Sequence, residues 1–372
     1  MALIPFDDYP VHQTSEPLAH SGDGHPDQYD RFWFNGYTED FYFAVALGVY
    51  PNRGVIDAAF SVVHDGTQRS VFASGRIPLD RTHTQVGPIR IEIIEPMRIN
   101  RITVDAPEYG LSADLTAHAR TAAYEEPRGI RNVGTIRGWD VTRATQMIEW
   151  TGEFSSGGTR IDLAGETVFG TKDRSWGVRP VGQPALSAPV EGSKQMFFLW
   201  SPLNFEDICL HYMVHEDSAG QAWSQTSAAL PVILDGDPVF GPEANNFRKL
   251  ENVRHQISWQ PGLRRANEAM LHIPAADGIA PEVKLTPLFA FRMKGAGYFH
   301  PEWAHGTWRG ELVVGGEEAS TESLDVLSPE CVHLQQIVRA EWGERTGLGV
   351  LEQLVVGPYE PAGFHDFLDG AQ

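Results

Sequence analysis

The stretch VIDAAFSVVHDGTQRSVFASGRIPL (55–79) decides the fold class of this chain. Two runs rich in Val, Ala, Phe and Ser (55–63 and 70–79) flank the polar turn HDGTQ (64–68). An Asp-Gly pair between two such runs is a strong signal for a β-hairpin, because these residues tolerate the positive φ angles of the tight turn. The stretch therefore predicts a pair of antiparallel strands.

The same pattern continues on both sides of this hairpin. FYFAVALGVYP (41–51) is an apolar run that ends in proline, and the segment 88–105 alternates apolar and polar residues. Runs 145–154 and 159–170 flank SSGG (155–158), which predicts a second hairpin. We find no amphipathic helix of more than about three turns. The spacing predicts roughly 16–20 short strands, as in β-sandwiches and β-barrels.

A Pro- and Gly-rich stretch, RPVGQPALSAPVEGS (179–193), is the best candidate for a domain boundary. We therefore expect an irregular N-terminal arm (1–30) and two β domains (31–190 and 191–372). Each domain is long enough for one barrel or one strongly curved sandwich, and no residue-level repeat relates them.

The composition excludes several classes of function. The chain has 372 residues, with 29 Lys+Arg against 49 Asp+Glu and a formal net charge of −20, so neither nucleic acid nor an anionic membrane is an expected partner. No apolar run reaches about 18 residues, and MALIPFDDYP (1–10) has no signal-peptide pattern. Cys209 and Cys331, far apart in sequence, are expected to be buried thiols in a reducing compartment, which predicts a cytoplasmic protein without stable membrane insertion.

GTKDRSWGVRP (170–180) is the most distinctive segment of the first half. In a functional interpretation, Asp173 donates or accepts a proton, Arg174 or Arg179 orients it, and Trp176 is an apolar wall. In a structural interpretation, Asp173 pairs with an arginine and Trp176 plugs the end of a barrel. The residues alone leave both interpretations open.

The sequence DRSWGVR (173–179) resembles the Asp-His-x-Trp-Gly signature of the AttH-like and hydroxyneurosporene synthase (carotenoid 1,2-hydratase) superfamily, whose relatives include Svf1-like proteins and Diels–Alderases. The resemblance extends to IEWTG (148–152) before the signature and FFLW (197–200) after it, and covers most of 31–230. It implies an all-β fold of two lipocalin-like (calycin) β-barrels in tandem.

The resemblance also implies a site. Asp173 matches the aspartate that, with nearby aromatic residues, is implicated in protonating an isolated alkene, and Trp150 matches an upstream tryptophan. Glu149 is a second candidate acid–base residue. The chain has Thr171 where the hydratases have Tyr and Arg174 where they have His, and we expect the guanidinium to lower the pKa of Asp173. The expected ligand-binding residues around this signature are Trp150, Trp176, Arg179 and Trp200.

A second cluster, GAGYFHPEWAHGTW (295–308), lies in the other half. Its proline and glycines predict a loop. Its histidines are candidate metal ligands, but a metal site would need further ligands from elsewhere in the chain. A hydrogen-bonded structural loop, the rim of a ligand pocket and a docking site for a partner protein are the alternatives, and we expect no metal. The candidate ligand-binding residues of this loop are Tyr298, His300, Glu302, Trp303, His305 and Trp308.

These observations predict a protein that binds a hydrophobic small molecule, such as a terpenoid, a steroid, a carotenoid fragment or a polyketide. The sequence has no dinucleotide-binding fingerprint, no P-loop and no nucleophile elbow, and we expect no organic cofactor. One hypothesis is an enzyme that hydrates, cyclises or isomerises the ligand with Asp173 and Glu149. The alternative is a carrier that binds the ligand without chemistry.

Overall fold

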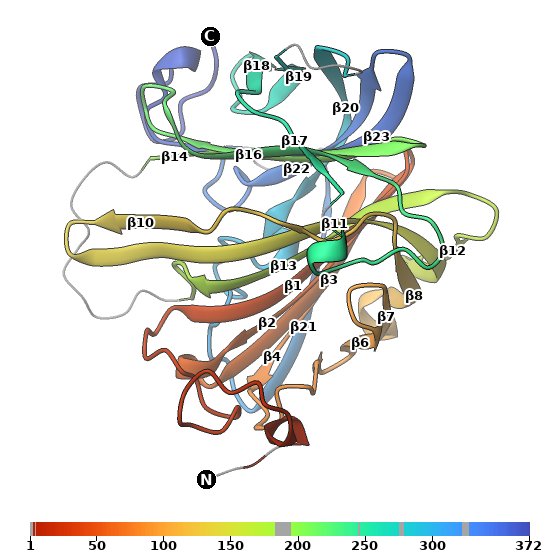
Figure 1. Ribbon diagram of the computed structural model, residues 1–372, viewed down its shortest axis with the longest axis vertical. Helices are drawn as coiled ribbons and strands as arrows, with labels where there is room; N and C mark the ends of the chain where they lie inside the picture. Colours follow the sequence, from red (N-terminus) through yellow and green to blue (C-terminus); the bar gives the residue numbers. More distant parts are fainter. Residues whose placement is uncertain (1–2, 4, 183–194, 245, 275–278, 322–326) are drawn as a thin grey trace.

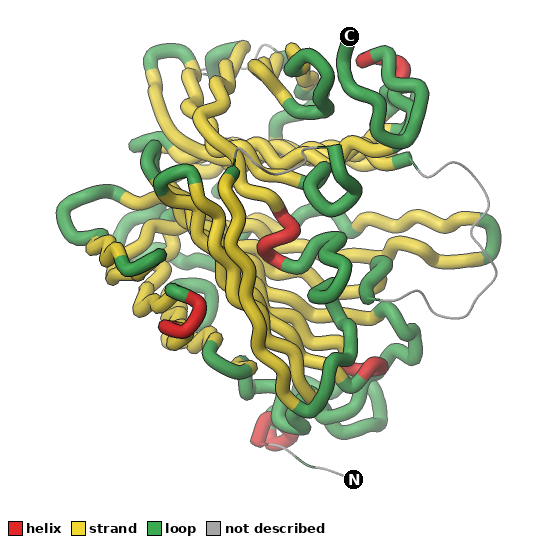
Figure 2. Tube along the Cα trace, turned by 180° about the vertical axis from the view of Figure 1, so that it is seen from behind, coloured by secondary structure: helices red, strands yellow, loops and turns green. Residues whose placement is uncertain are grey.

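The computed structural model describes residues 3, 5–182, 195–244, 246–274, 279–321 and 327–372. Within these ranges the chain forms β-strands and short 3-10 helices, and no α-helix. Figure 2 shows the 3-10 helices as short red pieces among the strands. They are η1 (Pro5–Asp8), η2 (Pro51–Arg53), η3 (Pro107–Tyr109), η4 (Pro242–Ala244), η5 (Met293–Ala296) and η6 (Glu360–Ala362). The all-β prediction is confirmed.

The first sheet is a nearly closed barrel of 14 strands in the lower part of Figure 1. Its hydrogen-bonded path runs β21-β4-β3-β2-β1-β13-β11-β8-β7-β6-β5, and β9, β10 and β12 pair with β11. Its strands are β1 (Gln28–Tyr37), β2 (Phe41–Tyr50), β3 (Val55–His64), β4 (Thr67–Arg76), β5 (Gln85–Val86), β6 (Ile89–Glu95), β7 (Ile99–Ala106), β8 (Leu111–Ala119), β9 (Tyr124–Glu125), β10 (Gly129–Val133), β11 (Ile136–Ser156), β12 (Thr159–Asp162), β13 (Val168–Val178) and β21 (Leu312–Ser320).

The second sheet is a half-barrel of 9 strands that lies above the first in Figure 1. Its order is β17-β16-β15-β14-β23-β22-β20-β19-β18. Its strands are β14 (Met196–Asn204), β15 (Ile208–Glu216), β16 (Ala222–Pro231), β17 (Arg248–Lys249), β18 (Arg254–Trp259), β19 (Ala266–His272), β20 (Glu282–Arg292), β22 (Leu334–Trp342) and β23 (Arg345–Val356).

Each sheet has its own apolar core, and a third core joins them. Phe34 and Phe43 belong to the core inside the first barrel, whereas Trp33 and Tyr42 pack outward against Trp200 of the second sheet. Both faces of β1 and β2 are therefore buried. This explains why 41–51 reads as a continuous apolar run instead of an alternating one.

The hairpin predicted at 64–68 is confirmed. β3 and β4 pair in full register, and the two turn residues, Asp65 and Gly66, have φ angles of 48° and 66°. The second predicted hairpin forms between β11 and β12, but the expected strand 159–170 is wrong in extent. It stops at Asp162, and β13 begins at Val168 after a turn.

The two halves of the chain share the first sheet. β21, from the C-terminal half, pairs antiparallel with β4 and so extends the edge of the first barrel. The boundaries expected at 1–30, 31–190 and 191–372 stay predictions, and the junction itself lies outside the described residues.

In the part of the chain that the structure describes, no helix is long and apolar enough to span a membrane. Cys209 and Cys331 are both buried free thiols, as predicted.

Candidate functional site

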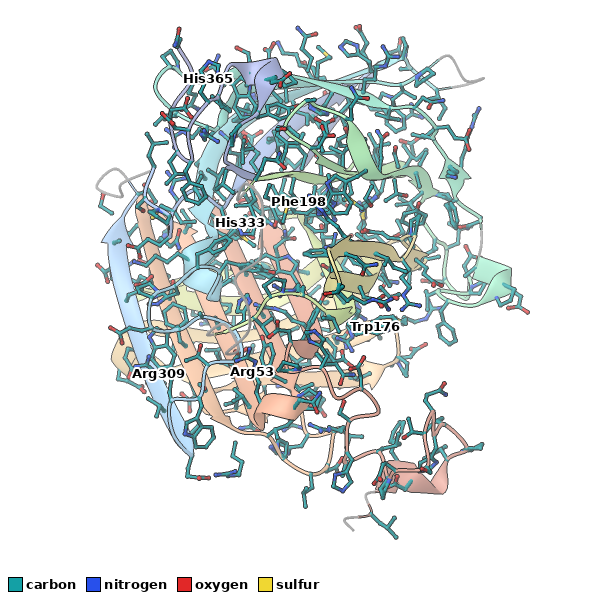
Figure 3. The ribbon with its side chains drawn as sticks, turned by 90° about the vertical axis from the view of Figure 1, so that its left-hand side faces the viewer. Arg53, Trp176, Phe198, Arg309, His333 and His365 are labelled. Atoms are coloured by element: carbon teal, nitrogen blue, oxygen red, sulfur yellow. The ribbon has the colours of Figure 1, made fainter. Side chains whose placement is uncertain are left out.

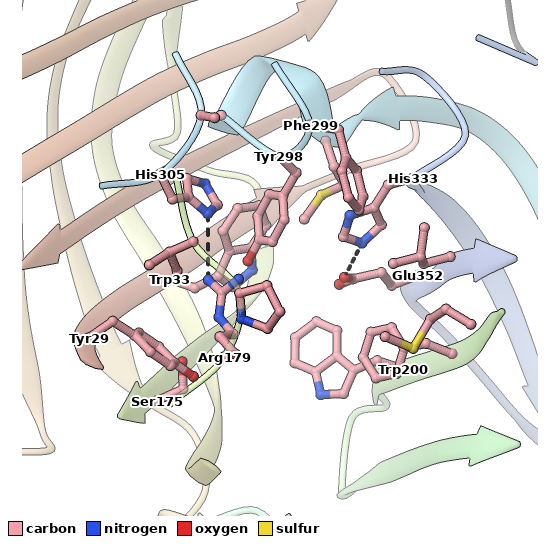
Figure 4. A pocket seen from close by; sticks show the side chains of 18 of the residues that line it. Tyr29, Trp33, Ser175, Arg179, Trp200, Tyr298, Phe299, His305, His333 and Glu352 are labelled. Atoms are coloured by element: carbon pink, nitrogen blue, oxygen red, sulfur yellow. Dashed lines mark hydrogen bonds and ion pairs between the residues drawn. The ribbon is translucent and has the colours of Figure 1, made fainter. Parts of the chain in front are cut away.

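A cavity of about 540 Å³ lies between the two sheets. Figure 4 shows how β1, β13, β14, β23 and the loop after η5 surround it. Its wall is mainly apolar, which favours a hydrophobic occupant. The Phe, Tyr and Trp side chains that line it are Tyr29, Trp33, Trp139, Phe198, Trp200, Tyr298 and Phe299.

Asp173 is a largely buried carboxyl group in the wall of this cavity. Alternation along β13 turns Asp173 and Ser175 towards the cavity. Asp173 Oδ2 lies 3.4 Å from Arg143 Nε, and Oδ1 is buried with no hydrogen-bond partner among the described residues. Burial raises the pKa of Asp173 to about 7, against the lowering effect of Arg143. Near neutral pH this carboxyl group can therefore both give and take a proton.

Glu126 adds to the effect of burial by competing with Asp173 for Arg143. Arg143 Nη1 lies 3.4 Å from Glu126 Oε2, so the guanidinium is shared between the two carboxylates. Glu126 also accepts a hydrogen bond of 2.8 Å from Thr145, and His211 Nε2 lies 3.0 Å from it. Burial opposes its ionisation, but Arg143 and His211 lower the pKa of Glu126 to about 2. The permanent negative charge of Glu126 in turn raises the pKa of Asp173.

Arg174 lowers the pKa of Asp173, as expected, but burial outweighs this effect and the pKa is raised overall. Arg174 lies on the opposite face of β13, where its guanidinium stacks 3.8 Å over the ring of Phe32 and pairs with Asp30 at 2.7 Å. Its effect on Asp173 is the smallest of the named contributions. The alternation of the strand separates these two neighbouring charges.

A second pair of polar groups, His333 and Glu352, lies across the cavity (Figure 4). His333 Nε2 is 2.7 Å from Glu352 Oε1, and Gln335 Nε2 donates to Glu352 Oε2 at 2.7 Å. With Nε2 as the donor to Glu352, Nδ1 is left as an acceptor, and it is buried with no partner in the described part of the chain. His333 can therefore accept a proton at this wall.

The loop after η5 supplies Tyr298, His300 and His305 to the cavity. His305 Nε2 donates to Ala296 O at 2.8 Å and Nδ1 faces Arg179 at 3.5 Å, so both ring nitrogens are engaged. Burial lowers the pKa of His305 well below its usual value, and nearby Arg31 and Arg179 add to this. The ring is therefore a neutral part of the wall.

His300 also fixes the shape of this loop. Its Nδ1 accepts from the backbone N–H groups of Glu302 and Trp303, each at 3.0 Å, and Nε2 lies 3.2 Å from Glu317 on β21. These bonds support the interpretation of 295–308 as a hydrogen-bonded loop that also forms a pocket rim. No group of three metal-ligating side chains occurs among the described residues.

The other candidates of this loop do not line the cavity. Trp303 stacks on Phe72 with ring centroids 5.4 Å apart. Glu302 pairs with Arg309 at 3.1 Å, and the indole of Trp308 is exposed beneath Arg76. All three of these candidates pack on or near the outer face of the first barrel.

Of the residues expected around Asp173, Arg179 and Trp200 line the cavity, but Glu149, Trp150 and Trp176 do not. Glu149 is half-exposed, 4.0 Å from Arg120. Trp150 is buried inside the first barrel, where Nε1 donates to Asn35 O at 2.8 Å. Trp176 is 41% exposed, and Figure 3 shows it apart from Phe198 and His333.

Sequence reasoning missed Arg143, His215, His333 and Glu352, which all line the cavity. The sequence signal that could have identified them is a charged or imidazole side chain inside an otherwise apolar strand, as in GVLEQLVV (349–356). Such a residue is expensive to bury without a role or a partner.

The fold of this chain is similar to that of a solved all-β protein. A protein of Nitrosomonas europaea named as an AttH superposes with a TM-score of 0.52 at 12% identity, over 95% of this chain and 97% of that one. A kievitone hydratase from Nectria haematococca gives a TM-score of 0.48 at 10% identity, over 87% of this chain and 88% of that one. No curated protein matches the sequence significantly. Residues 3–365 match one sequence family over nearly the whole chain, and the protein therefore belongs to the family of unknown function DUF8625.

Proposed function

We propose that this protein is a cofactor-free acid–base enzyme that hydrates, cyclises or isomerises a hydrophobic alkene in the cavity between the two sheets. The observation that carries the proposal is Asp173, a largely buried carboxyl group in an aromatic wall, whose Oδ1 has no hydrogen-bond partner among the described residues. Its pKa of about 7 leaves a substantial fraction protonated at neutral pH.

The first step is proton transfer from Asp173 Oδ1 to one alkene carbon, which leaves a carbocation and the Asp173 carboxylate. The indole faces of Trp33 and Trp200 can stabilise that cation. The resemblance of residues 173–179 to the hydratase signature supports an alkene as the proton acceptor.

The second step decides the product. In hydration, a water molecule adds to the cation and gives up one proton, which His333 Nδ1 or the Asp173 carboxylate can accept. In isomerisation or cyclisation, the cation instead loses a proton from a neighbouring carbon to the same bases. The contact of His333 Nε2 with Glu352 suits this role, because Glu352 stabilises the imidazolium that forms.

A hydrophobic-ligand carrier is the second candidate. The ion pair between Asp173 and Arg143 favours it, because a carboxylate held by arginine is also a common structural element. In that case the aromatic wall binds the ligand and no bond changes.

Deuterium uptake from heavy water separates the two candidates, because every variant of the proposed reaction passes through a protonated alkene. Geranylgeraniol, pregnenolone and β-ionone represent the terpenoid, steroid and carotenoid-fragment classes, together with any ligand extracted from the purified protein. The enzyme is expected to incorporate deuterium into at least one of them, and Asp173→Asn to incorporate none while still binding it. Recovery of every bound ligand without deuterium would support the carrier.

A further inference from the structure

A second cavity, of about 1070 Å³, lies inside the first barrel on the other face of β13. Phe32, Leu47 and Ile91 give it apolar walls, and all three belong to the core of this barrel. Residues of the N-terminal arm, Leu18 and His20 among them, line its entrance side. It shares β13 with the cavity between the sheets but is lined by different side chains of that strand.

Lys172 is the most buried of the charged residues that line this cavity. Lys172 is only 4% exposed, and in the sheet register it lies opposite Phe34, which belongs to the core of the first barrel. Nζ donates to Asn100 Oδ1 at 2.9 Å, and the sulfur of Met97 lies 3.8 Å away. Both partners are neutral. Burial lowers the pKa of Lys172 to about 8, and the nearby charge of Arg174 adds to this.

The carboxylates around the cavity are already paired with other cations. Asp30 pairs with Arg174 at 2.7 Å, and Glu92 lies 3.4 Å from Arg90. No carboxylate among the described residues is within ion-pair distance of Lys172. A buried ammonium without a counter-ion is unfavourable, because burial favours the neutral form.

Further hydrogen-bond donors of this cavity also lack acceptors. Asn100 Nδ2 is buried without a partner among the residues described. Arg81 donates through Nη2 to Ala19 O, but its Nη1 is buried and unpartnered in the same part of the chain. The donors at this site therefore suit a ligand with negatively charged acceptor oxygens.

We propose that the cavity inside the first barrel binds a monocarboxylate with a long apolar chain, such as a fatty acid. The carboxylate accepts hydrogen bonds from Lys172 and Asn100, and the chain lies along Phe32, Leu47 and Ile91. One deep ammonium matches one negative charge, and the apolar walls match a hydrocarbon chain better than a multiply charged phosphate. The proposal is independent of any chemistry at Asp173.

Isothermal titration calorimetry with lauric acid and dodecanol tests the proposal, because the two probes share a chain length and differ in charge. The natural protein is expected to bind the acid at least about tenfold more tightly than the alcohol. Lys172→Met, which keeps the length of the side chain and removes a buried charge, is expected to fold normally and to bind both probes equally.

Two control variants test whether the preference for the acid depends on Lys172 itself. Lys284→Met removes an exposed lysine on the second sheet, paired with Glu268 at 2.9 Å, and should keep the full preference for the acid. Asp173→Asn changes the cavity between the sheets and should also keep it. The proposal is overturned if neither probe binds, if both bind equally, or if Lys172→Met retains the preference. It is also overturned if Asp173→Asn removes the preference, because the acid would then occupy the other cavity.

Discussion

Lys172 and Asp173 are consecutive residues of β13 whose side chains line two different cavities. Asp173 faces the space between the two sheets, and Lys172 faces the interior of the first barrel. Burial moves both groups towards their neutral forms, since the pKa of the acid rises to about 7 and that of the amine falls to about 8. One strand thus provides a proton donor to one cavity and an ammonium to the other.

The raised pKa of Asp173 predicts a pH dependence of stability. The pKa rises from 3.8 to about 7 on folding, so between about pH 4 and pH 7 the folded state keeps a proton that the unfolded state releases. The contribution of Asp173 to stability therefore falls as pH rises through this window. Relative to Asp173→Asn, the natural protein should lose up to about 4 kcal/mol of unfolding free energy.

Urea denaturation of both proteins across this pH range measures the difference in their unfolding free energies. The contributions of the other titrating groups are common to both proteins and cancel in this difference. Asp114→Asn is a matched control of opposite sign. A hydrogen bond from Arg101 lowers the pKa of Asp114, so this carboxylate stabilises the fold above its unfolded pKa and loses that contribution as pH falls. A flat difference between the natural protein and Asp173→Asn would mean that Asp173 is ionised throughout.

Gln335 should be a major stabilising contact between the two sheets. Its Oε1 accepts from Asn35 at 3.1 Å and from Tyr42 at 2.6 Å, and its Nε2 donates to Glu352. Gln335→Met keeps the volume but removes one hydrogen bond from each of three buried side chains, which should cost about 3 kcal/mol or more in guanidinium denaturation.

Arg339→Met is the control for this experiment, because Arg339 also joins the two sheets but does so on the surface, through an ion pair with Glu39 at 2.7 Å. Exposed pairs contribute little, and we expect a loss of less than about 1 kcal/mol. Equal losses for the two variants would show that the buried bonds of Gln335 contribute no more than the surface pair.

Trp150 and Trp176 were both expected to bind ligand, but their positions predict different roles. Trp150→Phe removes the hydrogen bond to Asn35 O and part of a ring that packs on Phe43, at a cost of about 2 kcal/mol. Trp176→Phe changes an exposed ring and should alter stability by less than about 0.5 kcal/mol. Thermal denaturation and the deuterium assay check both variants. Loss of deuterium uptake in Trp150→Phe with unchanged stability would place this indole in the site.

Local signals in the sequence predicted the strands well, because their causes are local. The turn at Asp65-Gly66 needs only two residues that tolerate positive φ, and the sequence shows both. The pairing of β21 with β4 joins residues about 240 positions apart, and no pattern in the sequence of either strand predicts it. The break between Asp162 and Val168 was also missed, because the apolar residues on both sides suggested one strand.

The site was only partly predictable for the same reason. Asp173 stands within a recognisable segment, so a single sequence suffices to find it. Its pKa, however, depends on burial and on two residues distant in sequence. Arg143 lies on β11, and Glu126 lies between β9 and β10. Neighbours in sequence were misleading here, since Arg174 lies next to Asp173 in the chain but on the other face of the strand.

Glu126 should control the proton affinity of Asp173. In the natural protein Glu126 shares Arg143 with Asp173 and repels its carboxylate. Glu126→Gln removes the repulsion and leaves the guanidinium to Asp173 alone, so the pKa of Asp173 should fall. The upper end of the pH window over which Asp173 lowers the stability should then move to lower pH, and deuterium uptake at neutral pH should decrease.

The stability difference between Glu126→Gln and the double variant with Asp173→Asn, followed against pH, measures this shift. Glu39→Gln, which neutralises an exposed carboxylate paired with Arg339, should leave the window unchanged. If Glu126→Gln also leaves it unchanged, burial alone sets the pKa of Asp173. If the window moves but deuterium uptake stays the same, the protonated form of Asp173 is not the proton donor, and another group must protonate the ligand.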